Sequence, residues 1–148
     1  MPATTPETRA GYRHFFPIAT RWMDNDVYGH VNNVVYYAYF DTVINRYLID
    51  EGKLDFAADA AIGVCVESFC QYIKPVAFPE AIEAGLRVAH LGRSSVRYEI
   101  GIFPCGASAA SAQGHFVHVF VDRTTRRTTE IPRALREALE RIARSSRP

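Results

Sequence analysis

The fold is decided by Arg21-Trp22-Met23-Asp24-Asn25-Asp26-Val27-Tyr28-Gly29-His30-Val31-Asn32-Asn33, which runs directly into an apolar segment at 34–49. The stretch places carboxylates, an imidazole and amides in a glycine-containing turn just before a predicted helix. The first turn of a helix leaves backbone N–H groups unpaired and carries a partial positive charge. A carboxylate beside such donors can activate water or attack a carbonyl, while the N–H groups bind the developing oxyanion. The stretch therefore predicts acyl chemistry.

The helix predicted over 34–49 is apolar over most of its circumference. Its polar residues fall on one narrow stripe with i, i+4 spacing: Asp41, Thr42, Asn45 and Arg46. Because β-branched and aromatic residues are poor helix formers, burial by the rest of the fold has to hold this helix. We therefore expect a long helix enclosed on most sides.

The remaining elements follow from the pattern of apolar and polar residues. Alternation predicts strands at 12–19, 62–73, 82–88 and 96–102, and a run at 115–121 that is apolar on both faces predicts a central strand. Charge pairs after Pro132 predict a short C-terminal helix. Residues 1–9 are predicted to be a flexible N-terminal tail, and residues 10–148 a single domain. The order of strand, long helix, four strands and short helix indicates an α+β fold, with an antiparallel sheet of about five strands wrapped around the helix.

Composition excludes several classes of protein. With 148 residues, 48% of them hydrophobic, and a net charge of +1, the chain can form a core and gives no argument for a nucleic-acid or membrane partner. Neither a signal peptide nor an apolar run long enough to span a membrane is present, so a cytoplasmic location is expected. Cys65, Cys70 and Cys105 lack metal-ligand spacing, and neither a metal nor a cofactor is predicted.

The pattern Asp24-x-Asp26-x-x-Gly29-His30-Val31-Asn32-Asn33, followed by an aromatic-rich helix, resembles the hotdog-fold acyl-CoA thioesterases of the 4-hydroxybenzoyl-CoA thioesterase type. Weaker matches continue along the chain at Tyr72-x-x-Pro75, Arg93-Ser94-Ser95 and Val119-Phe120-Val121-Asp122 leading into Ile131-Pro132. The resemblance implies a hotdog fold that hydrolyses acyl-CoA to free acid and coenzyme A without a further cofactor. It also implies a homodimer at least, pairing into a homotetramer, with active sites between subunits.

By this resemblance Asp26 is the catalytic aspartate, acting as general base or as the nucleophile that forms an acyl-enzyme anhydride. The backbone N–H at Asn33 would polarise the thioester carbonyl. His30 would orient Asp26, contact substrate, or make a structural hydrogen bond that holds the turn. Asp24 is expected to stabilise the turn.

Further residues are candidates for substrate binding. Tyr28 and Gly29 would line the entrance, where Val27-Tyr28 replaces the small residues usual in the family. Glu67, predicted on the strand face opposite Val64 and Val66, is either a partner-subunit acid near the thioester or a solvent-facing residue. Candidates for the coenzyme A phosphates are cationic or hydroxyl-bearing: Lys74, Arg93, Ser94 and Ser95.

Two other functions stay open as alternatives. The first is a hotdog enoyl-CoA hydratase, an enzyme class that pairs an Asp with a His about five residues later and has an Asn-Pro between them. His30 follows Asp26 by four residues and Asp24 by six, and no proline lies between, so the spacing argues against this function. A non-catalytic acyl-CoA binding module would have no need of Asp26. The sequence leaves the acyl group unspecified, and a carrier-protein thioester is a further possible substrate.

Overall fold

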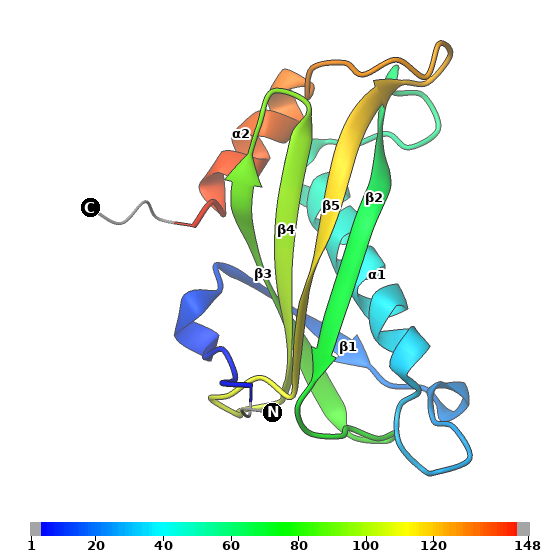
Figure 1. The fold of residues 1–148 in the computed structure, drawn as a ribbon, viewed down its shortest axis with the longest axis vertical. Helices are drawn as coiled ribbons and strands as arrows, with labels where there is room; N and C mark the ends of the chain where they lie inside the picture. The colour runs from blue at the N-terminus through cyan, green and yellow to red at the C-terminus, as the bar shows by residue number, and fades with distance from the viewer. Residues whose placement is uncertain (1–3, 145–148) are drawn as a thin grey trace.

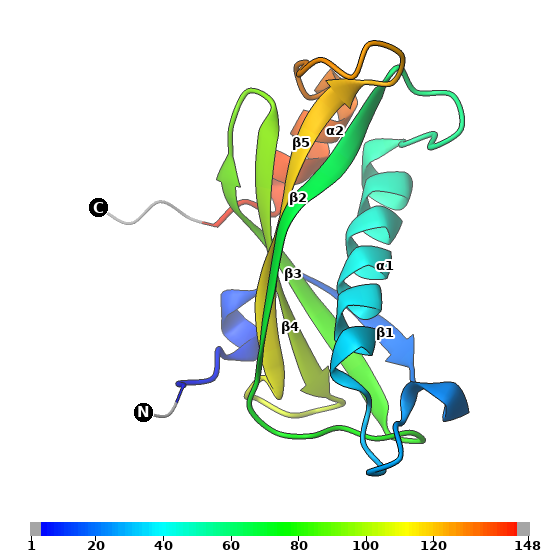
Figure 2. The ribbon, with the colours of Figure 1, turned by 45° about the vertical axis from the view of Figure 1, so that its right-hand side comes forward.

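The computed structural model describes residues 4–144, and its five antiparallel strands form one sheet (Figure 1). The strands are β1 (His14–Ala19), β2 (Ala61–Tyr72), β3 (Ala81–Leu91), β4 (Ser95–Pro104) and β5 (Ala112–Asp122), in the spatial order β1-β3-β4-β5-β2. The helices are α1 (Asn33–Gly52), α2 (Arg133–Arg141) and two short 3-10 turns, η1 (Arg9–Gly11) and η2 (Trp22–Asp24). The sheet twists alongside α1 (Figure 2), which is the α+β hotdog arrangement that the sequence predicts.

Helix α1 begins where its capping residue dictates. The Asn32 side chain accepts a hydrogen bond from the N–H of Val34, as a preferred N-cap residue does. The helix ends at Lys53, whose left-handed φ of 58° breaks the helical backbone. The predicted helix at 34–49 is confirmed and is slightly longer at both ends. No helix among residues 4–144 is long and apolar enough to cross a membrane.

The core lies between α1 and the inner face of the sheet. Phe40, Ile44 and Tyr47 of α1 are almost completely buried there. They pack against alternate residues of β3 and β4, namely Ile82, Ala84, Leu86, Val88, Val96, Tyr98, Ile100 and Ile102. Burial of each large apolar side chain is worth about 1.5–3 kcal/mol, so tertiary contacts hold this helix despite its weak intrinsic propensity.

The solvent-exposed face of α1 is wider than the polar stripe in the sequence predicts. Asp41, Thr42 and Arg46 are exposed as expected, but Val34 and Ile49 are also 64% and 41% exposed. The helix is therefore enclosed on fewer sides within one chain than its apolar circumference indicates. Its exposed apolar residues are available for contacts with another molecule.

Helix α2 closes the other end of the core. Leu135 and Leu139 are buried, and the Tyr47 hydroxyl donates a 2.6 Å hydrogen bond to the carbonyl of Ala138. Beyond α2 the chain runs beside β3, where Ala143 forms a bridge with Val88. The segment after α2 therefore covers a part of the β3 edge that β1 does not reach.

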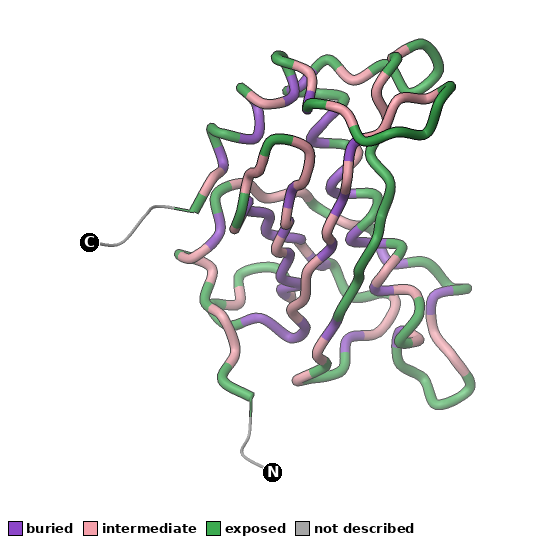
Figure 3. The backbone as a smooth tube through the Cα atoms, turned by 45° about the horizontal axis from the view of Figure 1, so that its top comes forward, coloured by how far each residue is buried: buried purple, intermediate pink, exposed green. Residues whose placement is uncertain are grey.

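Strand β2 forms an open edge of the sheet. It pairs with β5 on one side, and no strand among the described residues pairs with its other side. Its residues are mostly exposed (Figure 3), including large apolar side chains: Val64, Val66, Phe69 and Tyr72. A bulge interrupts the pairing between Cys65 and Glu67. A long apolar edge of this kind is a template for pairing with another chain.

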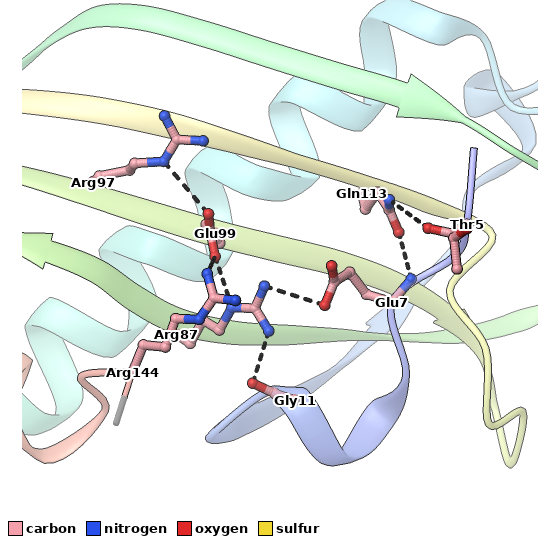
Figure 4. A network of polar contacts seen from close by, with 8 residues as sticks. All are labelled: Thr5, Glu7, Gly11, Arg87, Arg97, Glu99, Gln113 and Arg144. Atoms are coloured by element: carbon pink, nitrogen blue, oxygen red, sulfur yellow. Dashed lines mark hydrogen bonds and ion pairs between the residues drawn. The ribbon is translucent and has the colours of Figure 1, made fainter. Parts of the chain in front are cut away.

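The N-terminal segment corrects one prediction. Residues 4–9, expected to belong to a flexible tail, lie on the outer face of the sheet, where the N–H of Glu7 donates to Gln113. The buried Arg87 guanidinium binds the Glu7 carboxylate, the Gly11 carbonyl and the Glu99 carboxylate (Figure 4). A buried arginine requires such partners, and it therefore fixes the segment in place. Residues 1–3 lie outside the described part of the chain.

Candidate active site

The Asp26 turn is held by its own backbone. The N–H of Gly29 donates to the Asp26 carbonyl at 3.0 Å, and the N–H of Asp26 donates to the His30 carbonyl at 2.9 Å. Gly29 has a φ of +86°, in the region that residues with a side chain rarely adopt. A bridge between Asn25 and Val31 closes the base of the loop. The turn therefore presents the Asp26 side chain in a fixed position next to the start of α1.

The two oxygens of the Asp26 carboxylate have different surroundings. Oδ1 accepts the N–H of Tyr28 at 2.9 Å, whereas the nearest donor to Oδ2 is the Asn32 side-chain amide at 3.5 Å. Because Asn32 Oδ1 accepts the N–H of Val34, the amide NH₂ of Asn32 is turned toward Asp26. No role for Asn32 was predicted from the sequence, although the preference for Asn at N-caps is a signal that could have found it.

The first turn of α1 contains one open donor. The N–H of Val34 is taken by Asn32 Oδ1, and the N–H of Val35 donates to the Asn32 carbonyl at 2.9 Å. The N–H of Asn33 has no hydrogen-bond acceptor among residues 4–144. An open N–H at a helix N-terminus is a donor of the kind that stabilises an oxyanion, and the Asp26 carboxylate lines the same pocket.

Four of the predicted site residues meet in one pocket of about 320 Å³. They are Asp26, His30, Asn33 and Lys74. The remaining lining residues are apolar or aromatic: Val31, Tyr36, Tyr72, Ile73 and Pro75. His30 holds the turn through its backbone carbonyl, and its side chain is exposed at the pocket.

A second depression, of about 610 Å³, shares Asp26 with this pocket. Its lining includes Tyr28 and Gly29, as the sequence predicts for the entrance, together with Trp22 and Val27. The exposed fractions of Trp22, Val27 and Tyr28 are 83%, 93% and 84%. Large apolar side chains gathered at this exposure mark a contact surface rather than an ordinary loop.

Asp24 has the structural role expected of it. Its side chain is completely buried and accepts hydrogen bonds from the Tyr39 hydroxyl at 2.7 Å and from the backbone and side chain of Arg21. Burial acts to raise the pKa of the Asp24 carboxyl, but the hydrogen bonds from Tyr39 and Arg21 together outweigh it and lower the pKa. Asp24 therefore remains ionised and anchors the start of the loop.

Glu67 lies away from the Asp26 pocket. Regular alternation places it opposite Val64, but the bulge after Cys65 shifts the register by one residue, so that Glu67 shares the outer face of the sheet with Val64. There its carboxylate contacts His115 Nε2 at 2.6 Å. This location corrects the predicted strand face of Glu67.

The predicted phosphate-binding turn, Arg93 to Ser95, joins β3 to β4. The opposite end of β3 adjoins the site loop, where the N–H of Phe78 donates to Asn25. Since β3 rises about 3.3 Å per residue, the turn and the loop are roughly 30 Å apart within one chain. The Arg93 side chain pairs with Glu130.

Among residues 4–144, no group of three or more His, Cys, Asp or Glu side chains is placed to hold a metal ion.

Comparisons with known proteins find relatives along most of the chain. The sequence model of the thioesterase-like superfamily matches residues 20–139. The PA5185 protein of Pseudomonas aeruginosa strain PAO1 is 54% identical, with 97% of this chain and 100% of that chain covered and a TM-score of 0.94. The PA2801 protein of Pseudomonas aeruginosa is 31% identical, with 85% and 97% covered and a TM-score of 0.79.

A more distant structure shares the fold alone. The 1,4-dihydroxy-2-naphthoyl-CoA thioesterase Slr0204 of Synechocystis is 12% identical, with 84% of this chain and 93% of that chain covered and a TM-score of 0.77. No curated protein matches the chain. The superfamily match spans the Asp26 turn, all of α1 and most of α2. The chain therefore belongs to the thioesterase-like superfamily.

Proposed function

We propose that this protein hydrolyses acyl-CoA thioesters to free acid and coenzyme A. One observation carries the proposal: the Asp26 carboxylate and Asn33, whose N–H is open, line the same pocket. A thioester carbonyl bound between them would have a base or nucleophile near its carbon and a donor near its oxygen. With Asp26 as general base, water gives a proton to Asp26 as it adds to the carbonyl carbon, and the C–S bond breaks when the tetrahedral intermediate collapses. With Asp26 as nucleophile, the C–S bond breaks when the acyl-enzyme anhydride forms, and water then hydrolyses the anhydride to the free acid and Asp26. In both routes the released thiolate takes up a proton.

The surroundings of Asp26 suit this reaction. The firm hydrogen bond from Tyr28 engages Oδ1, so Oδ2, with its long contact to Asn32, is the oxygen available to accept a proton or attack. Negative charge on the carbonyl oxygen would meet the Asn33 N–H and the positive end of α1. Removing one oxyanion donor from an enzyme typically costs about 10²–10³ in kcat.

The coenzyme A part of the substrate is supported by Lys74, which lines the same pocket and carries an ammonium group suited to a phosphate. Solved structures with this fold include Slr0204 and BH1999, a gentisyl-coenzyme A thioesterase that is 21% identical with a TM-score of 0.75. His30 is placed to contact the substrate. Arg93, Ser94, Ser95 and Glu67 would take part only if a second subunit carries them to the pocket.

We further propose a homodimer whose second copy completes the site, with two dimers forming a tetramer. The open edge of β2 offers backbone hydrogen bonds to a partner strand, and Val66 on that edge is 60% exposed. The apolar side chains beside Asp26, Trp22 and Tyr28 among them, are exposed in the single chain. A second copy that covers both surfaces would also exclude water from the thioester.

The test is thiol release from short, medium, long, branched and aromatic acyl-CoAs, compared between the wild type and Asp26→Asn. Because a general base contributes typically about 10²–10⁴ in rate, kcat should fall by about 10² or more in the variant. Asp50→Asn, a matched change at an exposed position outside the pocket, should leave kcat unchanged. Full activity in Asp26→Asn would refute the assigned role.

Other outcomes point to the alternatives. Saturable acyl-CoA binding without turnover of any substrate would favour the binding module. Hydration of crotonyl-CoA would favour the hydratase. Turnover of acyl-carrier-protein thioesters alone would keep the chemistry and change the substrate.

A further inference from the structure

Tyr72, the last residue of β2, meets the first turn of α1. Its hydroxyl donates a hydrogen bond to the carbonyl oxygen of Asn33 at 3.0 Å, between residues 39 positions apart in the chain. Its ring contacts Tyr36 edge to face, with the ring centroids 5.1 Å apart and an angle of 80° between the rings. Both tyrosines line the Asp26 pocket. The reaction proposed above gives Tyr72 no role.

The residue that Tyr72 holds is the one with the open donor. The chain leading into α1 is already tied by its backbone, where the N–H of Val31 donates to Val76 at 2.8 Å and the N–H of Asn32 to Asp24 at 2.9 Å. Those bonds fix the residues before Asn33. The bond from Tyr72 ties Asn33 itself to the end of the edge strand, so the start of the helix is held on both sides of the Asn33 N–H along the chain.

The phenol can serve only as a donor to the backbone. Burial first, and then the neighbouring Cys70 thiol and Tyr37 hydroxyl, raise the pKa of Tyr72 well above its usual value, so the hydroxyl keeps its proton. A phenol has one proton to donate, and here it is committed to the Asn33 carbonyl. Tyr72 is therefore poorly placed to donate to a substrate oxyanion directly, and its contribution has to pass through Asn33.

We propose that Tyr72 is a positioning residue that holds Asn33 so that its N–H faces the thioester carbonyl, an inference that rests on the proposed function. An oxyanion donor works within about 2.7–3.1 Å of the charged oxygen. A displacement of about 1 Å can cost about 10²-fold in rate. Loss of the Tyr72 hydroxyl would loosen Asn33 without removing the donor, and the expected loss of rate is correspondingly smaller.

The test compares Tyr72→Phe with Tyr47→Phe. Tyr72→Phe keeps the ring and its contact with Tyr36 but loses the hydrogen bond to Asn33. Tyr47→Phe, at a position of α1 outside the pocket, loses the 2.6 Å hydrogen bond to the carbonyl of Ala138. We expect kcat on the best acyl-CoA substrate to fall about tenfold in Tyr72→Phe with KM changed less than about twofold. Tyr47→Phe should lower the melting temperature and leave kcat unchanged.

A second readout does not depend on turnover. Amide hydrogen exchange in the first turn of α1 should be faster in Tyr72→Phe than in the wild type, and unchanged there in Tyr47→Phe. Unchanged exchange, or faster exchange with unaltered kcat, would overturn the proposal. A rise in KM alone would overturn it too, because it would make the hydroxyl a substrate contact. If the wild type hydrolyses no thioester, the proposed function fails, and unchanged exchange would still refute the holding of Asn33 by Tyr72.

Discussion

At the scale of single residues, Asn32 joins two parts of the site that could otherwise move independently. Its side-chain oxygen caps α1 through Val34, and its side-chain nitrogen is turned toward Asp26 Oδ2. The cap is a matter of helix stability, whereas the contact with Asp26 concerns the charge and orientation of the carboxylate. Two substitutions can separate these effects.

We predict that Asn32→Asp keeps the stability of the wild type but loses activity. Aspartate caps a helix as well as asparagine does, while a second carboxylate beside Asp26 replaces an amide donor with a like charge. Asn32→Ala should lose activity and, in addition, about 1 kcal/mol of stability. Thermal unfolding and kcat/KM, measured on both variants, check the prediction. Equal activity in Asn32→Asp and wild type would contradict it.

The sequence predicts the polar half of the pocket better than the apolar half. Asp26, His30 and Asn33 lie within a few residues of one another, so a local motif is enough to bring them together. Tyr72 reaches the same pocket only because β2 ends beside the first turn of α1, and that depends on the packing of the whole sheet. Glu67 was placed on the wrong strand face because a bulge cannot be read from simple alternation.

At the scale of elements, the N-terminal segment is fastened to the sheet by Arg87. The guanidinium lies between Glu7 and Glu99 and over the ring of Tyr12, 4.6 Å from its centroid. Burial acts to raise the pKa of Glu99, but Arg87 first, followed by Arg144 and Arg97, outweighs it and lowers the pKa. The ion pair is therefore maintained at neutral pH, with Arg87 only 5% exposed.

We predict that Arg87→Met destabilises the protein by about 3 kcal/mol, because it removes the nearest cation from the largely buried Glu99 carboxylate and leaves only the longer pairs with Arg97 and Arg144. The N-terminal segment should become sensitive to proteolysis, while kcat stays unchanged because Arg87 lies outside the Asp26 pocket. Arg133→Met serves as the control: this arginine on α2 is exposed, and removing its pair with Glu137 should cost less than about 0.5 kcal/mol. Urea unfolding of both variants decides, and equal stabilities would contradict the prediction.

The contacts of this N-terminal segment, residues 4–9, could not be predicted from composition. Residues such as Pro2, Thr4 and Thr5 are typical of a tail, and alternation is absent before Tyr12. What holds residues 4–9 is a charge on β3, about 80 positions away, that needs a partner on the outer face of the sheet. Only the three-dimensional arrangement brings the two together.

At the scale of the whole molecule, the order of elements was enough to predict an α+β fold with an antiparallel sheet around one helix, and the resemblance carried by the Asp26 motif identified it as a hotdog fold. One buried helix and a set of alternating strands leave few ways to cover the apolar surface of that helix. The exposure of Val34 and Ile49 could not be predicted in this way, because the sequence of α1 does not reveal how much of the helix surface a second chain would cover.

We predict that the protein is a dimer in solution and that Val66→Lys, on the open edge of β2, shifts it toward the monomer. A charged residue on an edge strand opposes pairing with another strand. Phe56→Lys is the control, because Phe56 is 73% exposed in the connection between α1 and β2 and should not affect assembly. Light scattering after size-exclusion chromatography gives the mass. A Val66→Lys dimer would exclude this edge as the interface, and a fully active monomer would show that one chain holds the complete site.

The way in which the Asp26 turn is held has a consequence for how this protein can diversify. Backbone hydrogen bonds, Gly29 and the Asn32 side chain fix the loop, so its shape does not depend on the side chains of Val27 and Tyr28. Within one chain, those two positions can accept other residues at little thermodynamic cost while changing the chemistry of the surface next to the carboxylate. A library randomised at 27 and 28 would explore new acyl preferences on an unchanged loop backbone, which makes this loop the natural starting point for directed evolution.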